Sequence, residues 1–276
     1  MELKNKINFF ISGLSIVEKL IFLNIVIYII PFIINTFLFL FNLKNLDLLT
    51  WFTIDADLSQ LIFKPWSFIT YGFLHGSVSH IFWNMIILYY FGKILNNLFG
   101  DKLFKNLYLS GIAVGGLTYV LSYNIFPVFK GVDSVMIGAS AGVMSVLFYL
   151  ASYNPQRIIR ILFFDIKIIY IALFLILYDI IQIPLNNSGG HIAHIGGAVW
   201  GYYYSIRNNK GEDLVKSIFK NFKKNKSSNF NNAKHTSNFD QKRIDSILDK
   251  ISDSGYDSLT KSEKEYLFKV GKDKDK

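Results

Sequence analysis

The amino-acid sequence predicts an all-α protein: a polytopic membrane bundle of six transmembrane helices, followed by a small C-terminal helical hairpin. Of its 276 residues, 51% are hydrophobic and 17% are aromatic, which is typical of membrane helix bundles and rare in soluble domains. The apolar residues gather in stretches close to the ~20 residues that a helix needs to cross a bilayer. The basic residues lie at the edges of these stretches, which is the pattern expected of membrane topology.

Composition also excludes several classes of protein. The chain has no cysteine, so disulfides and thiolate metal sites are excluded. The net charge of +9 is explained better by membrane topology than by a nucleic-acid groove. We therefore expect the lipid bilayer as a partner and no nucleic acid. We also expect no removed signal peptide, because no small-residue cleavage site follows a short apolar core near the N-terminus.

The apolar stretches define six candidate spans in chain order. They are residues 18–42, 77–98, 103–125, 139–153, 166–184 and 191–207. The first is long and contains Pro31, so it is expected to tilt or kink. The fourth and sixth are short and carry glycines, which suits helices buried inside a bundle. Residues 43–76 mix aromatic with polar side chains and are expected to form an interfacial, partly inserted loop.

The lysines and arginines predict how the spans are oriented. They are frequent in the N-terminus, in the second and fourth connections and after Arg207, and sparse in the other connections. Basic residues favour the cytoplasmic side, so both termini are expected there. The prediction is an integral, multi-pass protein of a bacterial inner (cell) membrane, with residues 1–17 as a cytoplasmic N-terminus and residues 18–207 as the membrane domain.

The polar tail divides into two parts. Residues 208–239 are rich in Lys, Asn and Ser and predict a flexible basic linker. Residues 240–276 predict a small cytoplasmic helical hairpin. Its evidence is an apolar repeat at helical spacing and a capping box of Thr260 and Glu263. The apolar residues are Ile244, Ile247, Leu248 and Ile251, then Tyr266, Leu267 and Phe268.

Polar side chains recur at one depth in three of the spans. Ser140 opens the fourth span within Gly138-Ala139-Ser140-Ala141-Gly142, and His194 lies about one turn into the sixth. His80 and Asn84 lie in the first two turns of the second span. Such residues are costly inside a membrane and are functional candidates by default. All three spans begin on the same side, so we expect these side chains to converge.

These residue types are those of nucleophilic catalysis. A serine hydroxyl needs a base within hydrogen-bond reach, and a neutral imidazole such as that of His194 suits the role. The tetrahedral intermediate carries an oxyanion that needs prearranged donors. His80, the Asn84 amide and the backbone amide of Ser140 could supply them. The pattern predicts peptide-bond chemistry inside a membrane.

Taken together, these residues resemble the rhomboid intramembrane serine proteases of bacterial type. The resemblance covers roughly residues 15–207 and rests on three ordered motifs: His75-x4-His80-x3-Asn84, Gly138-x-Ser140, and Ala193-His194-Ile195-Gly196-Gly197-x3-Gly201. It implies a hydrolase that cuts peptide bonds in or near transmembrane segments of membrane proteins. Ser140 would be the nucleophile and His194 the base of a dyad, with His80 and Asn84 as oxyanion donors and no cofactor or metal.

The resemblance also implies residues that shape the surroundings of the site. Gly197 and Gly201 would let the sixth span approach the fourth, as small residues four apart allow. Gly138 and His75 would support the site structurally, and the fifth span and the loop near Gly131 would gate substrate entry. Three positions differ from the commoner family pattern: Ala141 directly after the serine, Ser67 after Trp66, and Met144 in place of a tyrosine that stacks on the histidine.

Several alternatives stay open at this point. His191 and His194 could bind a metal with His75 and His80, but the spans show no well-placed carboxylate or thiolate, so no metal is expected. His191 is expected to have a structural or gating role at the helix mouth. Asp179, in the fifth span, could complete a triad or bond a neighbouring helix.

Two other functions compete with the protease. A catalytically silent rhomboid-like protein that binds or escorts transmembrane clients would not need all four of Ser140, His194, His80 and Asn84. A transporter with a histidine proton relay would need charged residues along a path through the spans, and only Asp179 approaches that.

Overall fold

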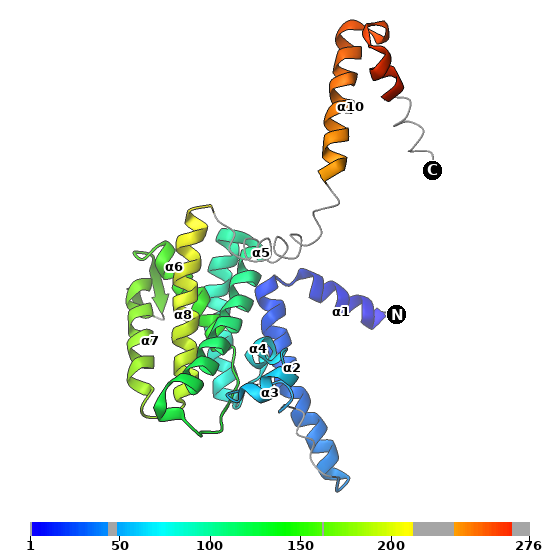
Figure 1. Cartoon of the computed structure of the whole chain (residues 1–276). Coiled ribbons are helices and arrows are strands. Elements are labelled where there is room, and N and C mark those ends of the chain that lie inside the picture. The colour runs from blue at the N-terminus through cyan, green and yellow to red at the C-terminus, as the bar shows by residue number, and fades with distance from the viewer. Residues whose placement is uncertain (1, 44–48, 162, 212–234, 267–276) are drawn as a thin grey trace. The chain divides into compact units, whose positions relative to one another are not determined.

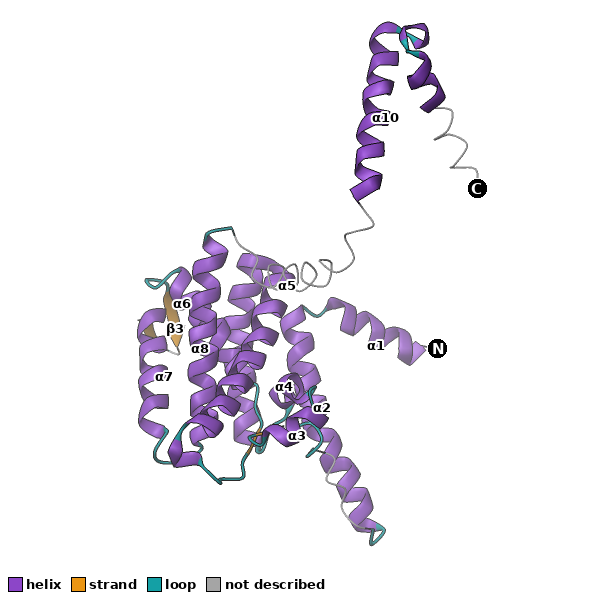
Figure 2. Ribbon diagram, in the orientation of Figure 1, coloured by secondary structure: helices purple, strands orange, loops and turns teal. Residues whose placement is uncertain are grey.

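The computed structural model of the chain describes residues 2–43, 49–161, 163–211 and 235–266. The chain forms two compact units, residues 1–214 and 215–276. Figure 1 shows the course of the chain, and Figure 2 shows that the described residues are mostly helical, as predicted. They also contain four short strands, which were not predicted.

The first unit consists of helices and two small antiparallel ribbons. Its helices are α1 (Glu2–Gly13), α2 (Ile16–Leu40), α3 (Leu58–Phe63), α4 (Ser67–Thr70), α5 (Val78–Ile125), α6 (Ser140–Tyr153), α7 (Ile168–Gln182) and α8 (Ser188–Asn209), with the 3-10 turns η1 (Tyr71–Phe73) and η2 (Pro127–Phe129). In one ribbon β1 (Ile54–Asp55) pairs with β2 (Val135–Met136), and in the other β3 (Ile158–Ile161) pairs with β4 (Phe164–Lys167).

Each of the six predicted spans lies on a helix, but the helices differ in how well they suit a membrane. Among the described residues, α2 and α5 are long and apolar enough to cross a bilayer, by length and composition. The helices α6 and α7 are apolar but shorter, with 14 and 15 residues. The start of α2 is set by a capping box of Ser15 and Glu18, which satisfies amide groups that the first turn leaves without partners.

The helix α5 contains two of the predicted spans, 77–98 and 103–125, with a break at Gly100. The backbone of Gly100 has φ 78° and ψ 171°, which are not helical values, and glycine adopts such a positive φ without steric cost. A Cβ added to Gly92 would lie 3.1 Å from the ring of Phe104. In a straight helix these residues would be ~18 Å apart along the axis. The chain therefore turns back on itself at Gly100 and forms a helical hairpin.

The core of the first unit is the close contact of α6 with α5 on one side and α8 on the other. A Cβ added at Gly197 or Gly201 of α8 would overlap the backbone carbonyl of Ala141 or Ser145. On the α5 side, a Cβ at Gly111 would overlap the Ser145 side chain. Small residues four apart allow such close packing of helices. Glycines of α5 and α8 thus allow both helices to pack closely against α6, which begins at Ser140.

The segment between α2 and α5 anchors the chain just before α6. The predicted interfacial loop 43–76 contains β1, α3, α4 and η1, and Ile62 and Phe63 are strongly exposed on it. Ile54 of β1 pairs with Met136 of β2. The Tyr71 hydroxyl donates to the Ile112 carbonyl at 2.7 Å, and the Gly138 amide donates to the Tyr71 carbonyl at 3.0 Å.

A β-hairpin precedes α7 where the sequence predicted only a connection and the start of the fifth span at residue 166. Its strands β3 and β4 pair Ile158 with Lys167, and α7 begins at Ile168. Isoleucine and phenylalanine favour strands, and the run is too short and too charged for a span. Arg160 and Asp165 face each other across the hairpin with a 2.8 Å ion pair.

The second unit contains α10 (His235–Ser254) and the 3-10 turn η3 (Tyr256–Ser258). Ile247 and Leu259 are buried within it. The helix α10 begins five residues before the predicted end of the linker 208–239. Residues 212–234 of that linker, and Leu267 and Phe268 of the predicted hairpin, lie outside the described residues.

Candidate active site

The position of Ser140 is set by the turn that leads into α6. Ser140 is the first residue of α6, so its backbone amide has no acceptor within the helix. The preceding Gly138 has φ +132°, and a Cβ there would lie 2.8 Å from the His80 imidazole. Both the backbone conformation and the space therefore require glycine at residue 138. The turn brings Ser140 against the first turns of α5, as the sequence predicted for residues at equal depth.

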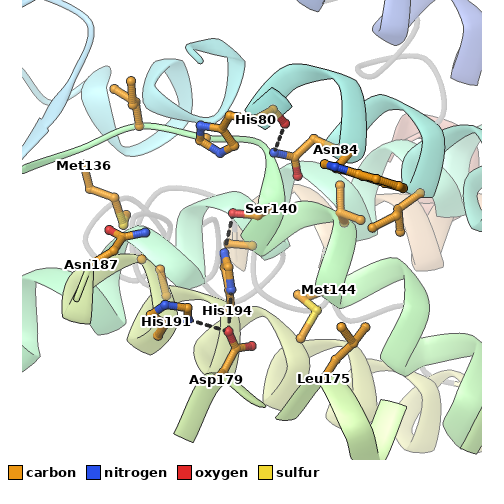
Figure 3. Close-up of a pocket in the computed structure, with 18 of the residues that line it drawn as sticks. His80, Asn84, Met136, Ser140, Met144, Leu175, Asp179, Asn187, His191 and His194 are labelled. Carbon is orange, nitrogen blue, oxygen red and sulfur yellow. Dashed lines mark hydrogen bonds and ion pairs between the residues drawn. The ribbon is translucent and has the colours of Figure 1, made fainter. Parts of the chain in front are cut away.

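A chain of hydrogen bonds joins Ser140 to two other helices. The Ser140 Oγ lies 2.6 Å from Nε2 of His194 in α8. The other ring nitrogen of His194, Nδ1, lies 2.8 Å from Oδ1 of Asp179 in α7. Figure 3 shows the three side chains in line, with the imidazole between hydroxyl and carboxylate. The structure thus brings together the predicted nucleophile and base, and it adds the carboxylate that the sequence left undecided.

His191 joins the same carboxylate. Its Nδ1 lies 2.7 Å from Oδ1 of Asp179, the oxygen that His194 also contacts. The rings of His191 and His194 are edge-on, with centroids 5.7 Å apart. Residues three apart on a helix share a face, which is why both histidines of α8 reach one side chain of α7. His191 thus lies in the first turn of α8, at the helix mouth as expected, and is buried beside His194.

The site lies in a cavity of about 490 Å³ between α5, α6, α7 and α8. His80 and Asn84 line it across Ser140 from His194, as Figure 3 shows. The Asn84 Nδ2 donates to the His80 carbonyl at 3.0 Å, so this amide is bonded within its own helix. The amide has a second N–H, which remains available to donate to an oxyanion beside Ser140. Both predicted donors are therefore near the nucleophile, but only His80 is free of such an internal bond among the described contacts.

His75 stays outside the cavity. It is buried, and its ring packs edge-on against that of His80 with centroids 5.0 Å apart. Burial, together with a smaller contribution from the neighbouring His80, lowers the pKa of His75 from 6.5 to about 4. The neutral ring supports His80 by packing, in line with the structural role that was expected for it.

The sequence predicted no metal because the spans showed no well-placed carboxylate. The structure corrects that premise, since Asp179 lies beside two histidines. One ligand atom each from Asp179, His191 and His194 lie within 4.8 Å of one another, and such a set can bind a metal ion. In the structure these atoms bond one another, and His194 also bonds Ser140. These contacts place His194 to accept a proton from the hydroxyl.

Asp179 is the functional candidate that the sequence identified least well. The signal was an acidic residue inside an apolar stretch, which is costly unless it is paired. Its partners lie 12 and 15 residues further on, in the next helix. No spacing rule predicts which way a side chain of one helix points toward another.

The fold and the site define a helical membrane protein with a serine–histidine centre between its helices. The comparison with protein families agrees, because the rhomboid domain model matches residues 63–208, more than half of the chain. The chain belongs to the rhomboid family, whose members act on transmembrane substrates within a membrane. A second model, of a family of unknown function (DUF6576), matches residues 226–272.

Several curated proteins are similar to the chain. RHOMBOID-like protein 12, mitochondrial, of Arabidopsis thaliana is 32% identical over 143 residues, which are 47% of this chain and 42% of the relative. Rhomboid-related protein 1 of Caenorhabditis elegans is 30% identical over 172 residues, 57% of this chain and 44% of the relative. Presenilin-associated rhomboid-like protein A, mitochondrial, of Danio rerio is 32% identical over 137 residues, 48% of this chain and 34% of the relative. The chain thus spans less than half the length of these relatives.

These relatives correct the predicted location. The protein was expected to lie in a bacterial inner membrane with both termini in the cytoplasm. Two of the three relatives just described carry the word mitochondrial in their names, which contradicts that expectation. Charge asymmetry predicts which loops share a side of a membrane, but it carries no information about which membrane that is.

Proposed function

We propose that the chain is an intramembrane serine endopeptidase that hydrolyses peptide bonds in or near transmembrane segments of membrane proteins. The observation that carries the proposal is the 2.6 Å contact between Ser140 Oγ and His194 Nε2. It lies in a cavity that His80 and Asn84 also line. A hydroxyl bonded to an imidazole base is the arrangement that nucleophilic catalysis requires.

The first half of the reaction follows from this geometry. Nε2 of His194 takes the hydroxyl proton while Ser140 Oγ attacks the carbonyl carbon of the scissile bond. The resulting oxyanion faces His80, the Asn84 amide and the Ser140 backbone N–H. That N–H is at the start of α6, where the helix dipole also favours negative charge. His194 then gives its proton to the leaving amine, and an ester to Ser140 remains.

The second half reverses these roles. A water molecule in the cavity gives a proton to His194 and attacks the ester carbonyl, and the same donors bind the second oxyanion. Collapse returns the proton to Ser140 Oγ and releases the new carboxyl group. The substrate must be extended at the scissile bond, because a helix engages its carbonyls in its own hydrogen bonds. Substrates with small or helix-breaking residues near the membrane boundary fit this requirement.

Membrane architecture is part of the proposal. Six helical segments would span the bilayer: α2, the two halves of α5, α6, α7 and α8. This assignment accepts α6 and α7 as short spans of 14 and 15 residues. The close glycine contacts of α8 with α6 support α6 and α8 as neighbours inside the bundle. Residues 18–207 would form the protease domain, and the tail would be a linker and a separate helical hairpin.

The test is cleavage of a single-span substrate by the purified full chain in lipid vesicles. Ser140→Ala and His194→Ala are expected to abolish cleavage. The matched control is Ser145→Ala, because Ser145 lies on the same helix and bonds the Gly142 and Leu107 carbonyls rather than the cavity. Cleavage by the Ser140 and His194 variants at the parent rate would refute the proposal. Binding of the substrate without cleavage by the parent would favour a silent, client-binding protein.

The tail is tested in the same assay. The whole site lies within residues 1–214, which form a compact unit. A chain that ends at residue 214 is therefore expected to cleave the substrate at the parent rate. A loss of the rate with intact folding would show that the hairpin takes part in activity.

A further inference from the structure

We propose that Asp179 and His191 act as a positioning pair for His194, so that the site works as a Ser140–His194–Asp179 triad with a second histidine. The inference rests on the proposed function and adds to it two residues and their roles. It departs from the dyad that the family resemblance implies. Asp179 and His191 do not touch the reacting atoms in this scheme, and they act through His194.

The first step is the burial of the Asp179 carboxylate. Asp179 is 3% exposed and lies in the last turn of the apolar helix α7. A buried carboxylate is costly unless donors satisfy it. Its Oδ1 receives both contacts, from Nδ1 of His194 at 2.8 Å and from Nδ1 of His191 at 2.7 Å. Two histidines of α8 thus satisfy a single oxygen of α7.

The second step concerns the tautomer of His194. An ionised carboxylate only accepts hydrogen bonds, so the proton of the neutral His194 ring is held on Nδ1. Nε2 then carries a lone pair toward Ser140 Oγ, as a general base requires. Without Asp179, the tautomer with the proton on Nε2 would be equally accessible, and that nitrogen could not accept the hydroxyl proton.

The third step is the role of His191. It is buried, it lies edge-on to His194, and its other neighbour is the ring of Tyr178, with centroids 6.1 Å apart. Its hydrogen bond to Oδ1 restrains the carboxylate from a second side. Asp179 therefore has little freedom to turn away from His194 when α7 moves relative to α8.

The fourth step explains why this chain needs the pair. Where some members of the family have a tyrosine that stacks on the histidine, this chain has Met144, which lines the same cavity as His194. Methionine is flexible and specifies the position of a neighbour poorly. The hydrogen bond from His194 Nδ1 to the Asp179 carboxylate, which His191 also contacts, holds the imidazole in place of an aromatic face.

The experiment compares variants of the full chain in lipid vesicles, with kcat and KM measured separately. Asp179→Asn is expected to lower kcat by about 10²-fold or more, with KM nearly unchanged, because the base is misplaced while the substrate still binds. The matched control is Asp165→Asn, the same change at an exposed carboxylate of the β3–β4 hairpin, which is expected to leave both constants unchanged. His191→Asn keeps a donor near the position of Nδ1 and should retain more activity than His191→Leu.

Chemical rescue separates positioning from packing. Asp179 lines the cavity, so Asp179→Ala leaves a space that formate can enter. Sodium formate is expected to restore part of the lost kcat, whereas sodium chloride at equal ionic strength should not. Restoration supports the proposal, because packing alone would not respond to a small carboxylate.

Two outcomes would overturn the inference. One is an Asp179→Asn variant with the parent kcat while Ser140→Ala and His194→Ala are inactive, which leaves the proposed function intact. The other is a loss of kcat that matches a loss of folded protein, measured by gel filtration, and that formate does not restore. A parent chain that does not cleave, or cleaves equally well without Ser140, refutes the proposed function instead.

Discussion

Gly197 of α8 lies directly against the backbone carbonyl of Ala141, the residue that follows Ser140 in α6. A Cβ at Gly197 would overlap that carbonyl oxygen. Gly197 is also one turn beyond His194, so the same contact sets the separation of the His194 imidazole from the Ser140 hydroxyl. The closeness of the two helices is therefore a requirement of the site as well as of the fold.

Substitution of Gly197 by alanine is expected to separate α6 from α8. The obstacle is backbone, which cannot turn away, so the cost should reach or exceed the ~1–3 kcal/mol typical of overpacking. A displacement of His194 by about 1 Å should lower kcat by about 10²-fold. Thermal unfolding and the cleavage rate measure the two effects. Gly13→Ala is the matched control, since nothing lies within 4 Å of a Cβ there. Equal stability of the Gly197 variant and the parent would refute the close contact.

The oxyanion assignment predicts a loss in kcat alone. Removal of one donor from an oxyanion site typically costs about 10²–10³-fold in kcat, and His80→Ala and Asn84→Ala are each expected to fall in that range. Asn84→Asp keeps the shape, loses the donors and adds a negative charge beside the oxyanion, so its kcat should be no higher than that of Asn84→Ala. Ile86→Ala, an exposed position on the same helix, serves as the control. An Asn84→Asp variant with the parent kcat would show that the amide does not donate to the oxyanion.

The second unit is expected to lose stability in acid through Glu263. Its carboxylate accepts from the Thr260 backbone amide at 2.8 Å, from the Lys250 ammonium at 3.0 Å and from the Thr260 hydroxyl at 2.8 Å. These contacts lower the pKa of Glu263 from 4.5 to about 2. Because the folded form has the lower pKa, the stabilisation is present above pH 4.5 and is lost as the pH falls toward 2.

Hydrogen exchange of residues 245–266 in the full chain, corrected for the intrinsic rate at each pH, measures this loss. Protection is expected to fall between pH 4.5 and 2 in the parent. Glu263→Gln should show weak protection with little pH dependence over that range. The same acid-induced loss in both proteins would assign it to other groups.

Chelation distinguishes a triad from a metal centre at Asp179, His191 and His194. Since His194 bonds Ser140 directly, treatment of the full chain with EDTA is expected to leave the cleavage rate unchanged. Metal analysis of the purified protein accompanies the assay. Loss of activity with EDTA and its return with Zn²⁺ would show that the three side chains bind a metal.

Much of this molecule is predictable along the chain. Apolar stretches locate the helices α2, α6, α7 and α8 to within a few residues, because burial in a bilayer or a bundle requires the same side chains. The motifs place Ser140, His194, His80 and Asn84 at one end of three helices, and the structure brings them around one cavity. The capping box of Thr260 and Glu263 is present as predicted, since it depends only on residues three apart.

Other features depend on contacts that the sequence does not display. The β3–β4 hairpin was predicted as a connection, because isoleucine-rich runs suit strands as well as helix ends. The sequence placed Asn84 near Ser140 but did not show that its amide donates to the His80 carbonyl within α5. The relatives, rather than any pattern in the chain, contradicted the predicted bacterial membrane.

The sequence by itself determined the helical class, the order of the helices and the candidates for nucleophile and base, Ser140 and His194, because hydropathy and local motifs are properties of neighbouring residues. Only the tertiary structure showed which side chains hold the His194 imidazole. Asp179 meets His191 and His194 because α7 packs on α8 with those faces inward. The direction of a hydrogen bond between helices depends on how they pack, and packing is set by the whole bundle at once.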